Sequence, residues 1–260
     1  MRLIKFLRRG RVCWGAIEGE RVMLLKESPF KKIRLSKESL KLKSIKRFLP
    51  PAQPTKIILV GLNYRDHARE LGMKIPKEPL IFLKPTTSLV GNNGDIVYPW
   101  GVKRLDYEAE LALVVKKRAK NLTFKSSGDY ILGYTCLNDV TARDIQKKDG
   151  QWTRAKSFDT FCPVGPWLET CLDPSSLKIR SYLNGKLKQD STTKNFIFSP
   201  QYLLYFIPQV MTLNEGDIIS TGTPPGVGPM KIGDIIEIEI EGIGILRNRV
   251  SVENSHLAHI

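Results

Sequence analysis

The sequence predicts an α+β fold that consists mostly of antiparallel β-strands with a few short helices. Short apolar runs rich in β-branched residues recur along the 260-residue chain and are separated by glycine- and proline-containing turns. Asn184-Gly185 lies between two such runs and predicts a tight hairpin. Residues 231–249 alternate apolar and polar side chains around Gly242 and Gly244, which predicts a final antiparallel pair.

The first 50 residues predict a small β-rich domain that precedes the main one. Short strands are expected at residues 2–7, 11–17 and 21–25. A short helix is expected over residues 36–47, where Ser36 is a candidate N-cap. The proline-rich stretch 49–54 must be extended and separates the two parts. We therefore expect a small domain at residues 1–50 and a larger one at residues 55–260.

Helices are expected at only a few places in the larger domain. A short helix is expected after Asn63, as its N-cap, and should end at Gly72. Residues 141–148 predict a helical turn, and residues 199–210 predict a helix with a serine N-cap followed by proline. The remaining chain is expected to form strands and turns.

Composition argues against a membrane-embedded protein. The chain is 42% hydrophobic, but no apolar run reaches the length of a membrane span. The basic N-terminus lacks the apolar core and cleavage site of a signal peptide. Four scattered cysteines predict buried free thiols rather than disulfides or a zinc site: Cys13, Cys136, Cys162 and Cys171. We therefore expect a cytoplasmic protein with no membrane partner.

The net charge of +15 is concentrated at the start of the chain. Residues 1–50 hold 15 Lys and Arg against 4 Asp and Glu, an excess of 11, whereas the other 210 residues hold 26 against 22. Such an excess can indicate nucleic-acid binding. The basic stretch, however, contains no nucleic-acid-binding module and little aromatic interleaving. We expect a solvated basic surface, or one that attracts anionic substrates, and no nucleic-acid partner.

Two carboxylates stand one residue apart in an apolar run. Residues 107–115 predict a strand, and strand alternation places Glu108 and Glu110 on the same face. Asp139, in a second apolar segment, could complete a three-carboxylate cup. All-oxygen ligands of this kind suit Mg²⁺, Mn²⁺ or Ca²⁺. The residues alone also fit a solvated outer face of a strand.

Nearby cations leave another interpretation open. Lys156 and Arg143 could neutralise the acids without any metal. Arg143 follows Asp139 by four residues and could meet a carboxylate bidentately, or it could form a surface ion pair. A lone lysine such as Lys156 would ordinarily be a surface residue.

His67 is the only histidine within the body of the chain, because His256 and His259 lie in the last five residues. His67 and Glu70 are three residues apart on an expected helix and therefore share a face. This spacing alone favours a paired surface histidine. The alternative is a base that works near neutral pH.

Two further positions have open alternatives. Lys84 ends an expected strand and could either touch a substrate or cap the strand end. The loop from Thr221 to Gly228 lacks the Lys-Ser/Thr of a nucleotide P-loop, so no ATP site is expected there. It could offer backbone amides and the Thr223 hydroxyl to a substrate carboxylate, or serve as a structural turn.

Several motifs, in one unbroken order over residues 55 to 250, together resemble the fumarylacetoacetate hydrolase family. They are Val60-Gly61-Leu62-Asn63-Tyr64 through His67, Phe82-Leu83-Lys84-Pro85, Glu108-x-Glu110, Asn138 to Gln146, Ala155 to Asp159, and Thr221 to Gly228. Within that family, the chain resembles the group of acylpyruvate hydrolases and 2-hydroxyhepta-2,4-diene-1,7-dioate isomerases. The resemblance implies a mixed β-roll catalytic domain, a small N-terminal domain and a homodimer.

The resemblance also implies roles for the candidate residues. His67 and Glu70 match the family's water-activating dyad, which is carried on a short mobile lid. The family pattern favours substrate contact for Arg143 and Gln146, and it places Lys156 beside the metal. Glu108, Glu110 and Asp139 match the metal site, for which Mg²⁺, Mn²⁺ or Ca²⁺ is expected.

The implied function is a divalent-metal-dependent enzyme that acts on 2-oxo or 2,4-dioxo carboxylic acids through a metal-stabilised enolate. The first hypothesis is hydrolysis of a carbon–carbon bond, with His67 activating water. The second is isomerisation or decarboxylation of an unsaturated 2-oxo dicarboxylate from aromatic catabolism. A third and weaker hypothesis is nucleic-acid binding by the basic N-terminus. The expected partner is a small 2-oxo acid.

Overall fold

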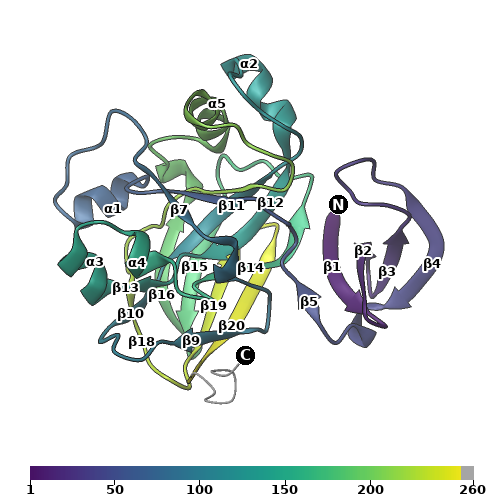
Figure 1. Ribbon diagram of the computed structural model, residues 1–260, viewed down its shortest axis with the longest axis horizontal. Helices are drawn as coiled ribbons and strands as arrows, with labels where there is room; N and C mark the ends of the chain where they lie inside the picture. Colours follow the sequence, from purple (N-terminus) through teal and green to yellow (C-terminus); the bar gives the residue numbers. More distant parts are fainter. Residues whose placement is uncertain (253–260) are drawn as a thin grey trace.

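Three β-sheets form the framework of the part of the molecule that the structure describes, and strands outnumber helices as the sequence predicted (Figure 1). The structure is a computed structural model that describes residues 1–252, so His256 and His259 lie outside the described residues. The largest sheet has twelve strands, and the other two have five and three. The prediction of a mostly antiparallel fold is confirmed, because only three of the strand pairs are parallel.

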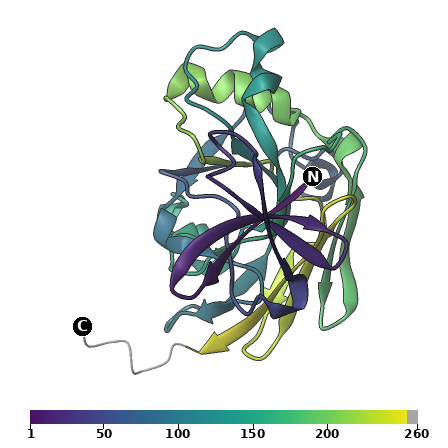
Figure 2. The same ribbon diagram turned by 90° about the vertical axis from the view of Figure 1, so that its right-hand side faces the viewer.

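The largest sheet contains strands from both of the predicted domains. Its order is β4 (Leu35–Lys41), β3 (Arg21–Leu25), β2 (Arg11–Glu18), β1 (Arg2–Arg8), β14 (Cys162–Glu169), β12 (Ile131–Asn138), β11 (Ala109–Val115), β17 (Ile218–Ser220), β6 (Ile57–Val60) and β7 (Ile81–Lys84), with β5 (Phe48–Leu49) beside β1 and β8 (Leu89–Val90) beside β14. The two parts meet where Arg2 pairs with Glu169 and Leu3 with Leu168. Strands β1 to β4 form a curved unit at one side of the molecule (Figures 1 and 2). Division into two domains stays a prediction.

The predicted helix over residues 36–47 is wrong. Strand β4 occupies most of that range and pairs with β3, and a single 3₁₀ turn, η1 (Leu42–Ser44), follows. The segment has good helix formers, but pairing with the edge of β3 satisfies its backbone and overrides that local preference. Ser36 caps no helix, since its hydroxyl accepts from the amide of Glu38 in a local turn.

The two smaller sheets lie in the larger part of the molecule, which follows residue 55. The five-stranded sheet has the order β16 (Lys186–Thr192), β15 (Lys178–Leu183), β19 (Ile235–Ile240), β20 (Gly244–Val252) and β9 (Asp95–Tyr98), and the three-stranded sheet has the order β13 (Thr141–Ala142), β10 (Leu105–Tyr107) and β18 (Gly228–Met230). The hairpin at Asn184-Gly185 is confirmed, because both residues have the positive φ of a type I′ turn. The final antiparallel pair is also confirmed as β19 and β20.

Helices are short. They are α1 (Arg65–Glu70), α2 (Phe124–Ser127), α3 (Arg143–Asp149), α4 (Thr153–Lys156) and α5 (Pro200–Val210), with 3₁₀ turns η2 (Thr86–Ser88), η3 (Gly128–Tyr130) and η4 (Thr193–Asn195). Ser199 caps α5 as predicted, since its side chain accepts from the amide of Tyr202. Within residues 1–252, none of these helices is long and apolar enough to cross a membrane.

The predicted cap of α1 is wrong. Tyr64, not Asn63, holds the N-cap position. The buried Asn63 side chain instead donates to the carbonyls of Phe198 and Thr221 and accepts from the amide of Phe198. It therefore ties the start of α1 to the segment before α5 and to the end of β17.

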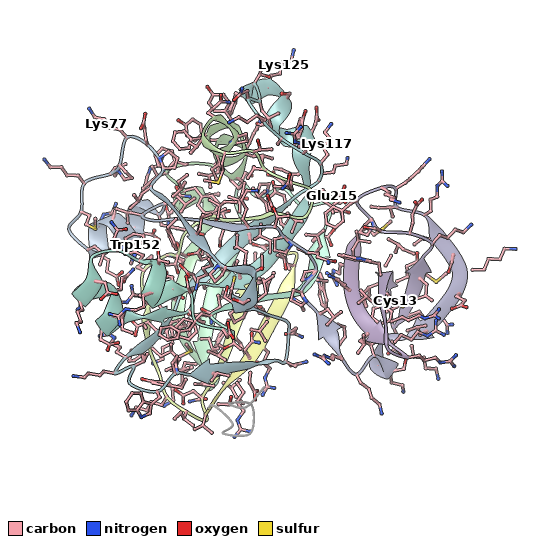
Figure 3. The ribbon with its side chains drawn as sticks, in the orientation of Figure 1. Cys13, Lys77, Lys117, Lys125, Trp152 and Glu215 are labelled. Carbon is pink, nitrogen blue, oxygen red and sulfur yellow. The ribbon has the colours of Figure 1, made fainter. Side chains whose placement is uncertain are left out.

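The main core fills the space between the large and five-stranded sheets, with Leu111, Leu113, Ile238 and Leu246 among its fully buried members. The cysteines are free, as predicted, but only two of the four are buried. Cys136 and Cys162 lie in this part of the molecule, whereas Cys171 is exposed and Cys13 is half-buried in the N-terminal sheet (Figure 3).

Candidate active site

At Glu108 the chain passes from the three-stranded sheet to the twelve-stranded sheet. The predicted strand over residues 107–115 is interrupted there, since β10 belongs to the three-stranded sheet and β11 to the twelve-stranded sheet. The Glu108 amide donates to the side chain of Asn138 (2.9 Å), and its carbonyl accepts from the amide of Asp139 (2.9 Å). This crossing holds Glu108 beside the end of β12, where Asp139 follows.

The structure brings the three predicted metal ligands together. Glu108, Glu110 and Asp139 each offer a carboxylate oxygen, and these oxygens lie within 4.8 Å of one another. All three residues are buried, with exposed fractions of 7%, 1% and 0%. A solvated outer strand face, the first alternative, is therefore wrong.

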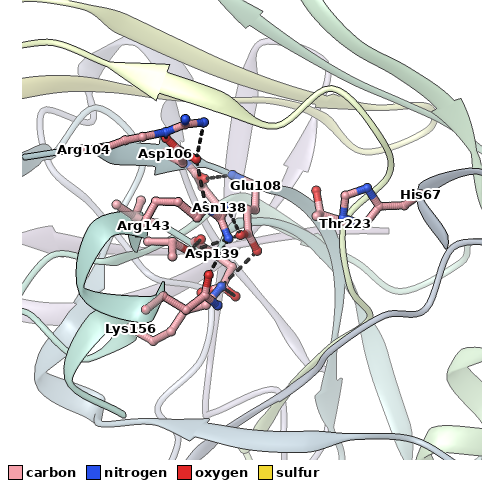
Figure 4. A network of polar contacts seen from close by, with 12 residues as sticks. His67, Arg104, Asp106, Glu108, Asn138, Asp139, Arg143, Lys156 and Thr223 are labelled. Atoms are coloured by element: carbon pink, nitrogen blue, oxygen red, sulfur yellow. Dashed lines mark hydrogen bonds and ion pairs between the residues drawn. The ribbon is translucent and has the colours of Figure 1, made fainter. Parts of the chain in front are cut away.

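Two cations neutralise two of these acids (Figure 4). The buried Lys156 ammonium donates to Glu108 Oε2 (3.0 Å) and Asp139 Oδ2 (2.5 Å). Arg143 binds Glu108 Oε1 through Nη2 (2.5 Å) and Asp106 Oδ2 through Nε (2.9 Å). Burial alone would raise the pKa of Glu108, but Lys156 and Arg143 together lower it to about 2. The same acids keep the pKa of Lys156 raised against its own burial, so the ammonium stays charged.

Lys84 lies beneath this cluster rather than in the pocket. Its ammonium donates to the carbonyls of Val140 (2.9 Å) and Phe161 (2.7 Å), and it is 2.8 Å from Asp139 Oδ1. The last contact is an ion pair outside hydrogen-bond geometry, and Oδ1 has no hydrogen-bond donor within the described chain. Lys84 is therefore paired with Asp139 inside the protein and is not among the residues that line the pocket, while substrate contact by Lys84 stays a prediction.

Glu110 is the acid that these cations leave unpaired. Among residues 1–252, no Lys or Arg lies within ion-pair distance of it. Its Oε2 accepts from the Ser220 hydroxyl and from the Gly222 amide (2.9 Å). Burial, followed by the charges of Asp139 and Glu108, raises the pKa of Glu110 well above its usual value. An unpaired buried carboxylate beside two others fits a hard divalent cation, which would supply the missing positive charge.

The His67–Glu70 pair lies on α1 as predicted. The two side chains meet at 2.7 Å, between His67 Nδ1 and Glu70 Oε2, and the Gly226 amide donates to Glu70 Oε1 (3.1 Å). This arrangement fixes the ring and leaves Nε2 as the nitrogen available to a substrate. The His67 side chain is 12% exposed and that of Glu70 is 42% exposed.

Thr223 joins the same site from the glycine-rich loop. Its hydroxyl accepts from Gln189 Nε2 (2.9 Å), which also donates to the carbonyl of Pro224 (2.8 Å). The amide of Ala109 in turn donates to Gln189 Oε1 (3.0 Å). Because its acceptor position is used by Gln189, the Thr223 hydroxyl has its own proton to donate into the pocket.

One pocket of about 350 Å³ connects these groups. The predicted residues that line it are His67, Glu108, Glu110, Asp139, Arg143, Gln146, Lys156 and Thr223. Figure 4 shows His67 and Thr223 to one side of the acid–lysine cluster. The outer wall of the pocket is mostly apolar and includes Leu71, Met73, Leu80, Phe82 and Trp152. A larger cavity of about 910 Å³ lies near α2 and α5 and contains none of the predicted residues.

The sequence alone did not point to Asp106, Gln189 or Trp152. Asp106 is fully buried and binds Arg143 and Arg104, so it fixes the guanidinium that faces Glu108. A charged residue within an apolar strand could have identified Asp106 as a candidate site residue from the sequence. Gln189 and Trp152 carried no such signal, because each acquires its place only through long-range packing.

Comparisons with known proteins agree with the geometry. The model of the family described as fumarylacetoacetate (FAA) hydrolase C-terminal matches residues 56–251, and an N-terminal family described as Rv2993c-like matches residues 1–51. An uncharacterized protein of Methanocaldococcus jannaschii is 58% identical over 83% of this chain and 88% of its own. The mitochondrial oxaloacetate tautomerase Fahd2a of Rattus norvegicus is 42% identical over 77% of this chain and 68% of its own.

A solved structure is similar over almost the whole chain. The 2-hydroxyhepta-2,4-diene-1,7-dioate isomerase from Mycobacterium marinum superimposes with a TM-score of 0.91 at 42% identity, covering 98% of this chain and 100% of its own. The comparison therefore includes the N-terminal strands as well as the pocket.

Proposed function

Because the chain belongs to the fumarylacetoacetate hydrolase family, we propose that it is an enzyme that forms the enolate of a small 2-oxo carboxylic acid and moves a proton on the adjacent carbon. The sequence favoured carbon–carbon hydrolysis. The names of two 42%-identical proteins, a tautomerase and an isomerase, favour proton transfer instead. Both reactions need the same enolate. The choice between hydrolysis and proton transfer therefore leaves the proposed site residues unchanged.

The buried side of the pocket suits the 2-oxo acid head of a substrate. Lys156 borders the pocket, and Asp139 and Glu108 raise its pKa against burial, so its ammonium can stabilise negative charge that develops on the oxo oxygen. Gln146 also faces the pocket, and its amide is oriented by Arg143 Nη1 (2.7 Å). A divalent cation held by Glu108, Glu110 and Asp139 would supply Lewis-acid charge beside the same oxygen.

The other side of the pocket suits proton transfer. His67 Nε2 can take a proton from C3 of the substrate, the two electrons of that C–H bond forming the enolate, and can return the proton to carbon or oxygen. Glu70 holds Nδ1 and stabilises the imidazolium that results. Thr223 can donate its hydroxyl proton to a substrate oxygen.

One observation carries the proposal: a buried ammonium and an oriented imidazole line the same small pocket. The test is to follow keto–enol interconversion of oxaloacetate by the absorbance of its enol, with and without Mg²⁺. The proposal predicts an enzyme-dependent rate that Lys156→Ala removes. A rate equal to that of the buffer would contradict it.

Carbon–carbon hydrolysis is the second candidate, and the His67–Glu70 pair favours it. An imidazole oriented by a carboxylate is equally able to take a proton from water, which then attacks a distal carbonyl. Incubation with acylpyruvates and identification of the products by mass tests this candidate. Pyruvate plus a free acid would support hydrolysis, and unchanged acylpyruvate alongside rapid tautomerisation would exclude it for those substrates.

A further inference from the structure

Helix α3 presents three polar side chains to the pocket, and only two of them were predicted. Arg143, Gln146 and Lys147 all line it. They stand at positions i, i+3 and i+4, which share one face of a helix. Lys147 thus extends the row of polar groups by one helical turn beyond Arg143, from the buried end of the pocket toward its mouth.

The three side chains differ in the hydrogen bonds and ion pairs that they form within the protein. Arg143 is bound to Asp106, Glu108 and Gln146, and Gln146 accepts from it. Lys147 is exposed, and no acid lies within ion-pair distance of its ammonium in the part of the chain that the structure describes. Its positive charge is therefore available to a ligand.

The wall around Lys147 is otherwise mostly apolar. Leu71, Met73, Leu80, Phe82 and Trp152 belong to the outer lining, and the indole N–H of Trp152 is the one polar side-chain group among these five. A carboxylate placed against these side chains would lose hydration and gain at most one neutral hydrogen bond. A cation at the same end of the pocket offsets that loss of hydration. A neutral, apolar substituent would not need a cation there.

We propose that Lys147 binds the distal carboxylate of the substrate and so selects 2-oxo dicarboxylates over their neutral analogues. The inference rests on the proposed function, which places the 2-oxo acid head at Lys156. Residues near Lys156 hold the reacting end, and Lys147, on the same helix face as Arg143, meets the charge at the far end. Lys147 is a specificity-determining residue and takes no part in proton transfer.

The experiment compares oxaloacetate with its 4-amide, which has the same length and lacks only the distal charge. Tautomerisation kcat/KM and calorimetric Kd are measured for both compounds with wild type, Lys147→Gln and Lys147→Glu. Lys148→Gln and Lys148→Glu are matched controls, because Lys148 is the adjacent exposed lysine of α3 and does not line the pocket. Thermal melting verifies that all variants are folded.

We expect Lys147→Gln to lower the preference for oxaloacetate over the amide by about two- to fivefold, the effect of a solvent-accessible ion pair. Lys147→Glu should lower it further through like-charge repulsion. The Lys148 variants should keep the wild-type ratio. An unchanged ratio in both Lys147 variants, or an equal fall in the Lys148 variants, would overturn the inference. If neither compound is turned over, the proposed reaction is wrong, and the ratio of Kd values decides the role of Lys147 by itself.

Discussion

The two sides of the pocket are built in different ways. Glu108, Asp139 and Lys156 are buried, and they are held by strands, by a helix end and by ion pairs of 2.5–3.0 Å. His67 and Glu70 stand on the six-residue helix α1, and one of their side chains is almost half exposed. The first group belongs to the core of the protein, and the second is attached to its surface.

This difference predicts separate consequences for substitution. Ion pairs in a low-dielectric interior are strongly coupled, so removing one partner leaves an uncompensated buried charge and lowers both stability and activity. A partly exposed pair contributes little to stability. Changes on α1 should therefore alter the rate of proton transfer while the fold remains intact.

The largest effect is expected from Lys156→Ala. The substitution leaves Glu108 and Asp139 buried without their shared cation, which should cost about 3–5 kcal/mol of unfolding free energy and abolish activity. Denaturant unfolding and turnover measure the two losses. Arg154→Ala is the control, because Arg154 is an exposed neighbour whose only ion pair within residues 1–252 is with Asp149. Wild-type stability in Lys156→Ala would show that the buried ion pairs are not coupled as described.

His67→Ala should have a large effect on rate alone. Losing a general base should lower kcat by about 10²–10⁴-fold, while the unfolding free energy changes by less than about 0.5 kcal/mol. Substrate Kd should be nearly unchanged, since the buried side holds the 2-oxo acid. If hydrolysis is the reaction instead, decarboxylation of the same substrate requires no attacking water and should be spared relative to hydrolysis, and equal loss of both would show that His67 is not specifically a water activator. An unchanged rate of tautomerisation would make His67 only a surface partner of Glu70.

Glu110→Gln should make the metal-free protein more stable. The amide oxygen can keep the hydrogen bonds from Ser220 and Gly222, while the repulsion between Glu110 and the other two acids is removed. We expect a gain of about 0.5–1.5 kcal/mol, the scale of one net polar interaction, in thermal or denaturant unfolding with a chelator present. A clear loss of stability would mean that the Glu110 charge is already compensated.

The smallest effect is expected at the basic N-terminal strands, which lie on the side of the molecule away from α1, α3 and α4 (Figure 1) and contribute no residue to the lining of the pocket. Any binding of DNA or RNA should be independent of sequence and should fade steeply with salt, because only phosphate contacts are expected. Fluorescence anisotropy at two or more salt concentrations measures this. Tight binding to one sequence that survives raised salt would contradict the prediction.

Local patterns predicted the fold best where neighbouring residues decide the structure. Asn184-Gly185 and Ser199-Pro200 form the expected turn and cap because their conformations are intrinsic to the dipeptides. The segment 36–47 and the strand break at Glu108 were not predicted, because pairing with β3 and the passage between two sheets depend on distant parts of the chain.

The site shows the same limit. Same-face spacing was sufficient to associate Glu108 with Glu110, the second apolar segment suggested Asp139 as a third carboxylate, and the family motifs favoured a metal site over the alternatives. The sequence did not show that Lys84 would lie beneath Asp139, or that Gln189 would orient Thr223. Both contacts join residues more than 30 positions apart, so only the folded chain reveals them.

We propose that the buried side of the pocket binds a divalent cation and is not merely a set of acids neutralised by Lys156 and Arg143. Calorimetric titration of Mn²⁺ or Mg²⁺ into metal-free protein tests it most directly, with Glu110→Gln beside Glu215→Gln, an exposed acid outside the pocket (Figure 3). We predict one ion per chain in wild type and in Glu215→Gln, and greatly weakened binding in Glu110→Gln. No binding to wild type at millimolar concentration, or equal binding to Glu110→Gln, would contradict the account.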